Sequence, residues 1–150
     1  MKLIEFLSDT EIKLDLEATE KDAALRELVE LLELEDEAQE ILIRLLRKRE
    51  NLGSTGIGKR VAIPHCRSLM VDRLRVAYGR KAKGLPFDAI DDKPVHHLFL
   101  IVAPPVEISN QYLPVLGRIA QLCKDPENLS ALDDVGSSKE FLQVLERTGI

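Results

Sequence analysis

The strongest constraint on the fold is an almost continuous apolar run of nine residues, Val95 to Ala103, with the sequence VHHLFLIVA. Pro104-Pro105 ends this run, because proline lacks the backbone N–H that a strand needs for its ladder. A strand with one face in water alternates apolar and polar residues, whereas a strand covered on both faces is apolar almost throughout. The run therefore predicts a central strand whose sheet is covered on both sides.

Helical and strand-like patterns alternate along the rest of the chain. Apolar residues at helical spacing predict helices at residues 19–32, 36–49, 114–122 and 137–148, and a single helical turn at 3–7. Strands are predicted at residues 11–16, 61–63 and 74–80. Because strands interleave with helices, we expect an α/β fold, a three-layer-like sandwich with a central mixed β-sheet flanked by helices.

Capping residues mark several of the expected helix ends. Thr19 is an expected N-cap, with Asp22 completing a weak capping box, and Ser137 forms a capping box with Glu140. Gly149 is an expected C-terminal cap, because glycine readily adopts the left-handed conformation. The last helix should therefore begin at Ser137 or at the residue after it, and end before Gly149.

Composition limits the class of protein. A chain of 150 residues, 45% hydrophobic and 31% charged, should form one globular domain spanning residues 1–150. Its 21 basic and 26 acidic residues give a net charge of −5, which argues against nucleic acid as a partner. The chain has no apolar window of membrane-spanning length, and its N-terminal sequence becomes acidic too early for a signal peptide. We expect a cytoplasmic protein, not inserted in a membrane, with Cys66 and Cys123 reduced.

A glycine-rich segment, GSTGIG at residues 53–58, combines three glycines with two hydroxyl side chains. This composition suits a loop whose backbone N–H groups face an anion. The segment matches neither a Walker A loop, since no Ser or Thr follows Lys59, nor the dinucleotide-binding pattern GxGxxG. An anion-binding loop and a plain turn are therefore both open interpretations.

His65 follows this segment at the end of the predicted strand Val61–Ile63. Pro64 should stop that strand and hold the backbone before His65 stiffly. An anion-binding loop next to a rigidly held imidazole is the arrangement that a phosphorylated histidine requires. The alternative for His65 alone is a capped or solvent-facing histidine.

Three other residues have side chains that can take part in metal or thiol chemistry, but their arrangement in the sequence argues against it. His96 and His97 are adjacent on a predicted strand, so their side chains point to opposite faces and cannot share one metal ion. Cys66 has no second Cys or His at ligand spacing, which favours a small packing residue. We expect structural roles for all three, and neither a metal nor an organic cofactor.

Several motifs resemble one known family. Arg49-Glu50, GSTGIG at 53–58 and AIPH at 62–65 are similar to the active-site region of the fructose/mannitol/nitrogen-type enzyme IIA domains of the bacterial phosphotransferase system. The motif FDAID at 87–91, Pro94-Val95 and the strand from Leu98 to Ala103-Pro104 extend the likeness in the same order. The resemblance covers essentially the whole chain.

The resemblance implies specific roles. His65 would be the phosphoryl acceptor, with an HPr-type phosphocarrier as the donor and a IIB domain as the usual next acceptor. Arg49 matches the family's active-site arginine and would balance the phosphate charge. Hydroxyl groups and N–H groups of Ser54, Thr55 and Gly56 would supply neutral donors. Without the resemblance, Arg49 would be interpreted as a solvated arginine at a helix end.

Two departures from the family pattern stand out. Tyr112 occupies the position of the family's second histidine, and a phenol can donate a hydrogen bond to phosphate while staying neutral at pH 7. Lys59-Arg60 stands where relatives often have a small residue and glycine. These two cations could attract phosphate, but we expect them to point to solvent.

The resemblance predicts a phosphoryl carrier, a histidine phosphotransferase that accepts its phosphoryl group on His65. A chain of this length looks most like the nitrogen-regulatory branch, so a regulatory target protein is the expected partner beside HPr. The alternative is a sugar-specific component that passes the phosphoryl group to a separate IIB domain of a fructose/mannitol-type permease. A purely regulatory binding role, in which phosphorylation only toggles an interface, is also open, and a third interpretation is a phosphate-binding domain that is never phosphorylated.

Overall fold

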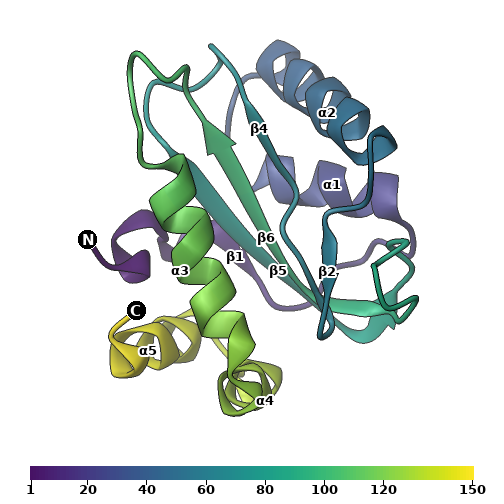
Figure 1. The fold of residues 1–150 in the computed structure, drawn as a ribbon, viewed down its shortest axis with the longest axis vertical. Helices are drawn as coiled ribbons and strands as arrows, with labels where there is room; N and C mark the ends of the chain where they lie inside the picture. Colours follow the sequence, from purple (N-terminus) through teal and green to yellow (C-terminus); the bar gives the residue numbers. More distant parts are fainter.

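The computed structural model describes residues 1–150, with a six-stranded mixed sheet as its middle layer (Figure 1). The strands are β1 (Ile12–Lys13), β2 (Gly56–Gly58), β3 (Val61–Ala62), β4 (His65–Arg67), β5 (Arg75–Leu85) and β6 (Val95–Ala103). Their order is β1-β5-β6-β3-β2, and β4 also pairs with β6. β6 is antiparallel to β5 and parallel to β3 and β4, which confirms the predicted central strand and mixed sheet.

Helices cover both faces of this sheet. They are the 3-10 turns η1 (Leu3–Phe6) and η2 (Asp9–Glu11) and the α-helices α1 (Lys21–Glu30), α2 (Asp36–Asn51), α3 (Tyr112–Lys124), α4 (Pro126–Asp134) and α5 (Ser138–Thr148). α1 and α2 lie on one face, and α3, α4 and α5 lie on the other (Figure 1). The predicted three-layer arrangement is therefore confirmed. None of these helices has the length and hydropathy of a membrane span.

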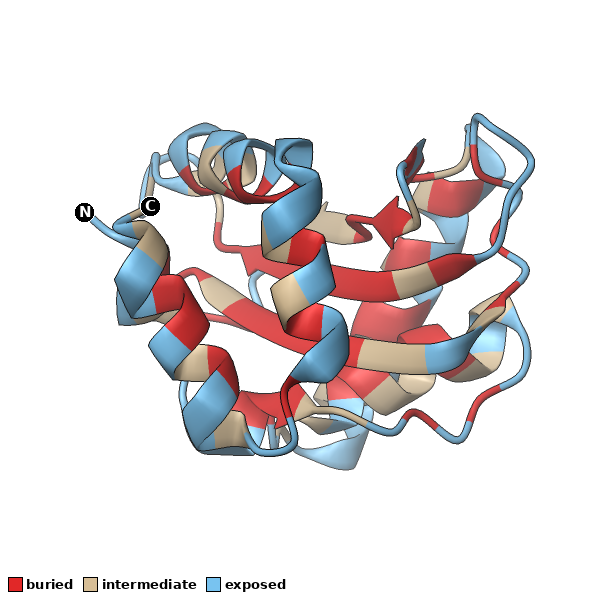
Figure 2. Cartoon of the chain, turned by 90° about the horizontal axis from the view of Figure 1, so that it is seen from below, coloured by how far each residue is buried: buried red, intermediate tan, exposed pale blue.

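The side chains of β6 divide between two apolar cores. Leu98, Leu100 and Val102 belong to the cluster under α1 and α2, and Phe99 and Ile101 belong to the cluster under α3, α4 and α5. All five side chains are fully buried, and Figure 2 shows the strands as the buried middle layer. The apolar run is continuous because successive side chains enter opposite cores, each of which excludes water.

Some expected helix ends differ from those in the structure. Thr19 is not the N-cap of α1, because the helix begins at Lys21 and Glu20 occupies the cap position without a side-chain bond. α5 matches the prediction more closely: the Ser137 hydroxyl accepts a hydrogen bond from the Glu140 N–H, and Gly149 ends the helix at φ 69°. The Glu140 carboxylate, however, accepts from the N–H of Gly136 instead of Ser137.

The glycine-rich segment is only partly a loop. Residues 56–58 form β2, which pairs antiparallel with β3 through a two-residue turn at Lys59-Arg60. Both turn residues have positive φ, 56° and 68°, the conformation that a tight hairpin turn requires and that glycine adopts most easily. Arg60 does not simply point to solvent, as its guanidinium binds the Asp133 carboxylate at 2.8 and 3.1 Å.

His65 begins a strand where the sequence indicates that one ends. β3 ends at Ala62, and β4 starts at His65 on the same edge of β6, opposite Ile101. Pro64 interrupts the strand because it has no N–H, but its carbonyl still accepts a hydrogen bond from the Ile101 N–H at 3.0 Å. The interruption therefore leaves the chain aligned along β6, which fixes the position of His65.

A buried polar network joins the sheet to α4. His97 is fully buried; its Nδ1 lies 2.6 Å from the Tyr78 hydroxyl and its Nε2 lies 2.8 Å from the Asp133 carboxylate. Because a carboxylate only accepts, Nε2 carries the proton and Nδ1 accepts from Tyr78. His96 instead faces the carbonyl of Ala82 at 3.1 Å, so the two histidines have separate structural contacts, as predicted.

This network should make stability depend on pH. Burial lowers the pKa of His97 from 6.5 to about 4, and the Asp133 carboxylate only partly offsets this effect. Between these two values the unfolded chain binds a proton that the folded chain rejects, so stability falls as the pH falls from 6.5 to 4. We expect wild type to lose about 3 kcal/mol more than His97→Gln, which keeps both hydrogen bonds without titrating. Urea unfolding at pH 7.5 and pH 4 measures the difference, and parallel losses in the two proteins would contradict it.

Candidate active site

Three elements bring His65, Arg49 and Tyr112 together. His65 is the first residue of β4, Arg49 lies in the last turn of α2, and Tyr112 is the first residue of α3. All three side chains are half-buried, so each has one side in the protein and one side in water. The site therefore lies at the surface, beside the end of α2 and the start of α3.

The hydrogen bonds of His65 define its neutral tautomer. Its Nδ1 lies 2.8 Å from the carbonyl oxygen of Ile63, which can only accept, so Nδ1 carries the proton. Its Nε2 then has a lone pair, and the Nε–H of Arg49 donates toward it at 3.3 Å. The outer nitrogen of the ring is thus the nucleophilic one.

Arg49 is held by backbone, not by a carboxylate. Its Nη1 donates to the carbonyl of Gly53 at 2.8 Å, and the side chain takes part in no ion pair. A guanidinium has five N–H donors, so these two contacts leave three N–H groups available to other acceptors. Such a group can bind an anionic oxygen through two parallel hydrogen bonds.

Tyr112 packs near both the imidazole and a second guanidinium. Its ring centroid is 5.5 Å from that of His65, and the Arg67 guanidinium lies 5.2 Å from the Tyr112 ring centroid. Burial raises the pKa of the Tyr112 phenol, while Arg49 and Arg67 lower it to a smaller extent, so the phenol is neutral at pH 7. Arg67 is a site residue that the sequence analysis missed, although residues two apart on a strand share a face.

The other predicted donors have protein partners. The Ser54 hydroxyl donates to the carbonyl of Phe87 at 2.6 Å and accepts from the Gly56 N–H at 3.0 Å. The Thr55 side chain is buried, and its hydroxyl donates to the Glu50 carboxylate. These contacts shape the loop and leave neither hydroxyl free beside His65.

Glu50 organises this loop and was missed as a site residue. Its buried carboxylate accepts from the Thr55 N–H at 3.0 Å and pairs with the Lys21 ammonium at 3.2 Å. The next residue toward the N-terminus is Arg49, so one turn of α2 both holds the loop and contacts the imidazole. The pattern Arg49-Glu50 before a glycine-rich segment is the signal that could have identified it.

A family model described as "Phosphoenolpyruvate-dependent sugar phosphotransferase system, EIIA 2" matches residues 5–148. The chain belongs to this family. The match confirms the resemblance noted in the sequence and the predicted class of protein, a phosphotransferase-system component of the EIIA type.

Known relatives and solved structures agree with this EIIA assignment. The "PTS system fructose-specific EIIABC component" of Bacillus subtilis (strain 168) is 31% identical over an alignment of 152 positions, which covers 98% of this chain and 23% of that protein. The chain thus spans about a quarter of that relative. The crystal structure of nitrogen regulatory protein IIA-Ntr from Neisseria meningitidis has a TM-score of 0.86 and 33% identity, covering 95% of this chain and 98% of that one.

A third comparison concerns the fold alone. The complex of enzyme IIAMTL and phosphorylated enzyme IIBMTL from Escherichia coli contains a chain with a TM-score of 0.75 and 21% identity. The alignment covers 94% of this EIIA chain and 97% of that one. Sandwiches of the same layout therefore occur in both nitrogen-regulatory and mannitol-specific IIA proteins.

The thiol next to His65 is unsuited to nucleophilic chemistry in this EIIA chain. Cys66 packs against the apolar cluster under α1 and α2, and burial raises the pKa of its thiol to about 12. A thiolate is the reactive form, so this side chain is inert near neutral pH. The prediction of a small packing residue is confirmed.

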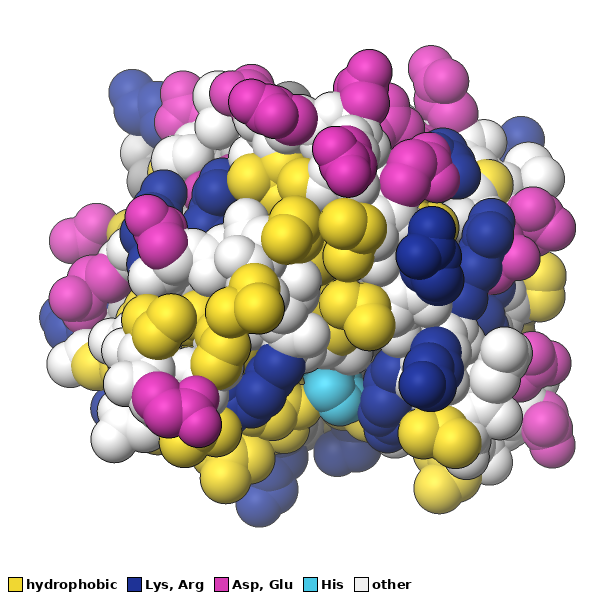
Figure 3. Space-filling view, turned by 90° about the horizontal axis from the view of Figure 1, so that it is seen from above, with side chains coloured by type: hydrophobic (Ala, Val, Ile, Leu, Met, Phe, Trp, Pro, Cys, Tyr) yellow, Lys and Arg dark blue, Asp and Glu magenta, His cyan; other side chains and the backbone are white.

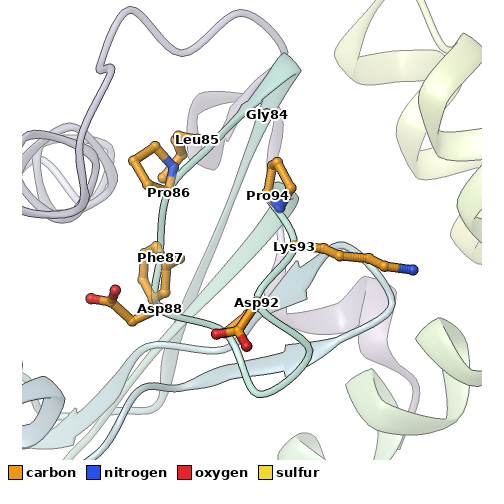
Figure 4. A pocket seen from close by; sticks show the side chains of 9 residues that line it. Gly84, Leu85, Pro86, Phe87, Asp88, Asp92, Lys93 and Pro94 are labelled. Carbon is orange, nitrogen blue, oxygen red and sulfur yellow. The ribbon is translucent and has the colours of Figure 1, made fainter.

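The cavity shown in Figure 4 lies away from the imidazole. It measures about 260 Å³ and is formed by the connection between β5 and β6, residues 84–94. Phe87 and Pro94 lie on two sides of it, and Lys93 extends away from it (Figure 4). Its lining includes neither His65 nor Arg49, so it offers no enclosed space beside the nucleophilic nitrogen.

The surface next to the site is apolar and basic. Exposed apolar side chains occur in the segments that border His65, namely Leu52, Leu69, Met70, Val106, Ile108 and Leu113. Figure 3 shows an imidazole with basic side chains on both sides and apolar side chains beyond them. Such a mixture is typical of a surface that binds another protein.

Removing the Thr55 hydroxyl should destabilise the loop. Thr55→Val keeps the side-chain volume but deprives the buried Glu50 carboxylate of a donor, which should cost about 1–3 kcal/mol of unfolding free energy. Thr55→Ser keeps the donor and serves as the matched control. Urea unfolding measures both variants, and equal stability of the valine and serine proteins would show that the hydroxyl does not support the loop.

Proposed function

We propose that this EIIA chain carries a phosphoryl group on Nε2 of His65. The observation that supports this role is the fixed neutral tautomer, because the Ile63 carbonyl keeps the proton on Nδ1 and leaves on Nε2 a lone pair that lies next to the Arg49 guanidinium. The lone pair forms the new nitrogen–phosphorus bond while the bond between phosphorus and the donor breaks, and the donor atom keeps that electron pair. The proton on Nδ1 stays in place throughout.

The residues around the imidazole suit a transfer of this kind. A phosphoryl transfer needs positioning and charge stabilisation more than covalent help from the protein. Arg49 has unused N–H donors beside Nε2, and Arg67 adds a second positive charge next to the Tyr112 ring. The backbone N–H of Ser54 has no partner and belongs to the peptide that contacts Arg49. We propose that these groups bind the phosphoryl oxygens, while Thr55 and Gly56 shape the loop that presents them.

The partners should be proteins with exposed phosphoryl groups. The donor is an HPr-type phosphocarrier, as the family resemblance implies, and the exposed apolar side chains near His65 suit transient docking of such a protein. The IIAMTL chain of similar fold was solved in a complex with phosphorylated IIBMTL, so a IIB domain is a reasonable acceptor. The location is proposed to be cytoplasmic, where those partners act.

The output of the phosphorylated chain is proposed to be regulatory. The likeness to IIA-Ntr, with a TM-score of 0.86 and 33% identity, favours a nitrogen-regulatory role and a regulatory target protein. The 31% identity to a fructose-specific component supports the alternative, transfer to a separate IIB domain. Transfer of the phosphoryl group from this chain to a purified fructose-type IIB domain would support the alternative, a sugar-specific role.

Replacement of His65 should abolish phosphorylation. Incubation with enzyme I, HPr and phosphoenolpyruvate should add one acid-labile phosphoryl group to the wild type, seen by intact mass. His65→Ala removes the Nε2 nucleophile and should show no added mass, whereas His96→Ala, a histidine bound to a backbone carbonyl elsewhere, should be labelled normally. Persistent labelling of His65→Ala would sink the proposed function.

Replacement of Arg49 should slow the same transfer. Arg49→Gln removes the positive charge beside Nε2, and we expect a rate about 100-fold lower in single-turnover transfer from phospho-HPr. Arg49→Lys should recover part of the loss, since it restores the charge but not the planar pair of donors. Arg47→Gln, on the side of α2 that pairs with Asp22, is the control and should transfer at the normal rate. A wild-type rate in Arg49→Gln would exclude this role.

A further inference from the structure

Lys21, the first residue of α1, contacts two elements that border the glycine-rich segment. Its ammonium is 3.2 Å from the Glu50 carboxylate of α2 and 3.6 Å from the Asp88 carboxylate in the β5–β6 connection. It also lies 4.7 Å from the ring centroid of Phe87, which is within the range of a cation–π contact. Phe87 and Asp88 lie next to each other in Figure 4. One lysine therefore joins α1, α2 and the β5–β6 connection.

The pair of Lys21 and Glu50 is largely shielded from water. The Glu50 side chain is 4% exposed and the Lys21 side chain is 19% exposed. The Glu50 carboxylate also accepts from the N–H and from the hydroxyl of Thr55. A buried carboxylate that loses its counter-ion becomes an uncompensated charge, which a folded protein tolerates poorly. The ammonium of Lys21 thus allows a carboxylate to hold Thr55 in a buried position.

The β5–β6 connection holds the other side of the same segment. The Ser54 hydroxyl donates to the carbonyl of Phe87 at 2.6 Å, and the Ile90 N–H donates to the carbonyl of Gly56 at 3.2 Å. Gly56 packs so closely here that a Cβ on it would lie 2.7 Å from the Cβ of Ala89. Residues 54–56 are therefore fixed between two elements, and the ammonium described above contacts both of them.

The glycine-rich segment is connected to the reacting nitrogen through Arg49. Nη1 of Arg49 donates to the carbonyl of Gly53 at 2.8 Å, and its Nε–H donates toward Nε2 of His65 at 3.3 Å. A shift of the segment would therefore move the guanidinium that is proposed to bind the phosphoryl oxygens. An unpaired charge on Glu50, the residue after Arg49, would also repel those oxygens.

We propose that Lys21 is a positioning residue for phosphoryl transfer to His65, and that it acts by neutralising the Glu50 carboxylate that holds the glycine-rich segment. This role rests on the proposed function, since it presupposes that His65 is the acceptor. The contacts with Phe87 and Asp88 keep the ammonium in place. No bond forms or breaks at Lys21, so its effect is on the rate of transfer within the complex and not on capture of the donor.

The test separates the transfer step from binding of the donor. Single-turnover transfer from phospho-HPr is measured at increasing donor concentration, which gives a maximum rate and a half-saturating concentration. Lys21→Met keeps an apolar side chain but removes the charge, and it should lower the maximum rate about 10-fold without changing the half-saturating concentration. Lys21→Arg restores a cation that can pair with Glu50 and should recover most of the rate.

A double variant tests whether Lys21 acts through Glu50. Lys21→Met/Glu50→Gln removes both charges, and a glutamine amide can still accept from the Thr55 N–H and donate to its hydroxyl oxygen. The double variant should therefore transfer faster than Lys21→Met, although it carries one more substitution. Urea unfolding of each protein shows that the compared proteins are folded.

Lys13→Met is the matched control. The Lys13 ammonium pairs with the Glu27 carboxylate at 2.9 Å, and this carboxylate also accepts from two backbone N–H groups. The control therefore removes the same charge from a similar ion pair, in a place that has no contact with the glycine-rich segment. Its maximum rate should equal that of the wild type.

The possible results have different consequences. A folded Lys21→Met protein with the wild-type maximum rate overturns the role of Lys21, as does equal slowing by the control. A double variant no faster than Lys21→Met also overturns it. A raised half-saturating concentration at an unchanged maximum rate assigns Lys21 to donor binding instead. If Lys21→Met does not fold, recovery of most of the wild-type rate by the double variant supports the role, and a rate about 10-fold lower overturns it. No labelling of the wild type by an active donor overturns the proposed function itself.

Discussion

The burial of β6 on both faces is the constraint on which the rest of the structure depends. Its alternate side chains enter two separate cores, and each buried aliphatic or aromatic side chain contributes about 1.5–3 kcal/mol. The same strand provides hydrogen-bonding partners on both edges: β5 along one, and β3 followed by β4 along the other. His65 owes its position to that second edge, because the carbonyl of Pro64 remains bonded to Ile101 where the strand is interrupted.

The parts of the fold that could be predicted are those with a strong local signal. The apolar run of β6 and the periodic pattern of α2 identify these elements without knowledge of their neighbours. β2 could not be found in this way, since its glycines indicate a loop and its pairing with β3 is a tertiary contact. α4 had a local signal that was not used: Asp125 caps the helix by accepting from the Glu127 N–H, and Pro126 occupies its first position.

The candidate site also contains residues that could be predicted from the sequence and residues that could not. His65 and Arg49 stand out in the sequence, the first by its rigid surroundings and the second by the family resemblance, and the structure places them in contact. The partner of the Ser54 hydroxyl could not be predicted, because it is the carbonyl of Phe87, which is distant in the sequence. Hydroxyl groups near glycines suggest phosphate donors, yet a buried carboxylate competes for the same donors and here it binds the Thr55 hydroxyl.

At an open site of this kind, contacts with the partner protein determine much of the specificity. The imidazole lies at the surface next to apolar and basic side chains, and the cavity at the β5–β6 connection does not include it. A small-molecule phosphoryl donor would find little to enclose it there, whereas a protein donor brings its own surface and excludes water as it docks. Discrimination between such donors then rests on groups that touch the partner and not on the reacting nitrogen. The neutral phenol of Tyr112 adds no charge to this face at physiological pH, so the guanidinium groups of Arg49 and Arg67 supply the fixed positive charge next to the imidazole.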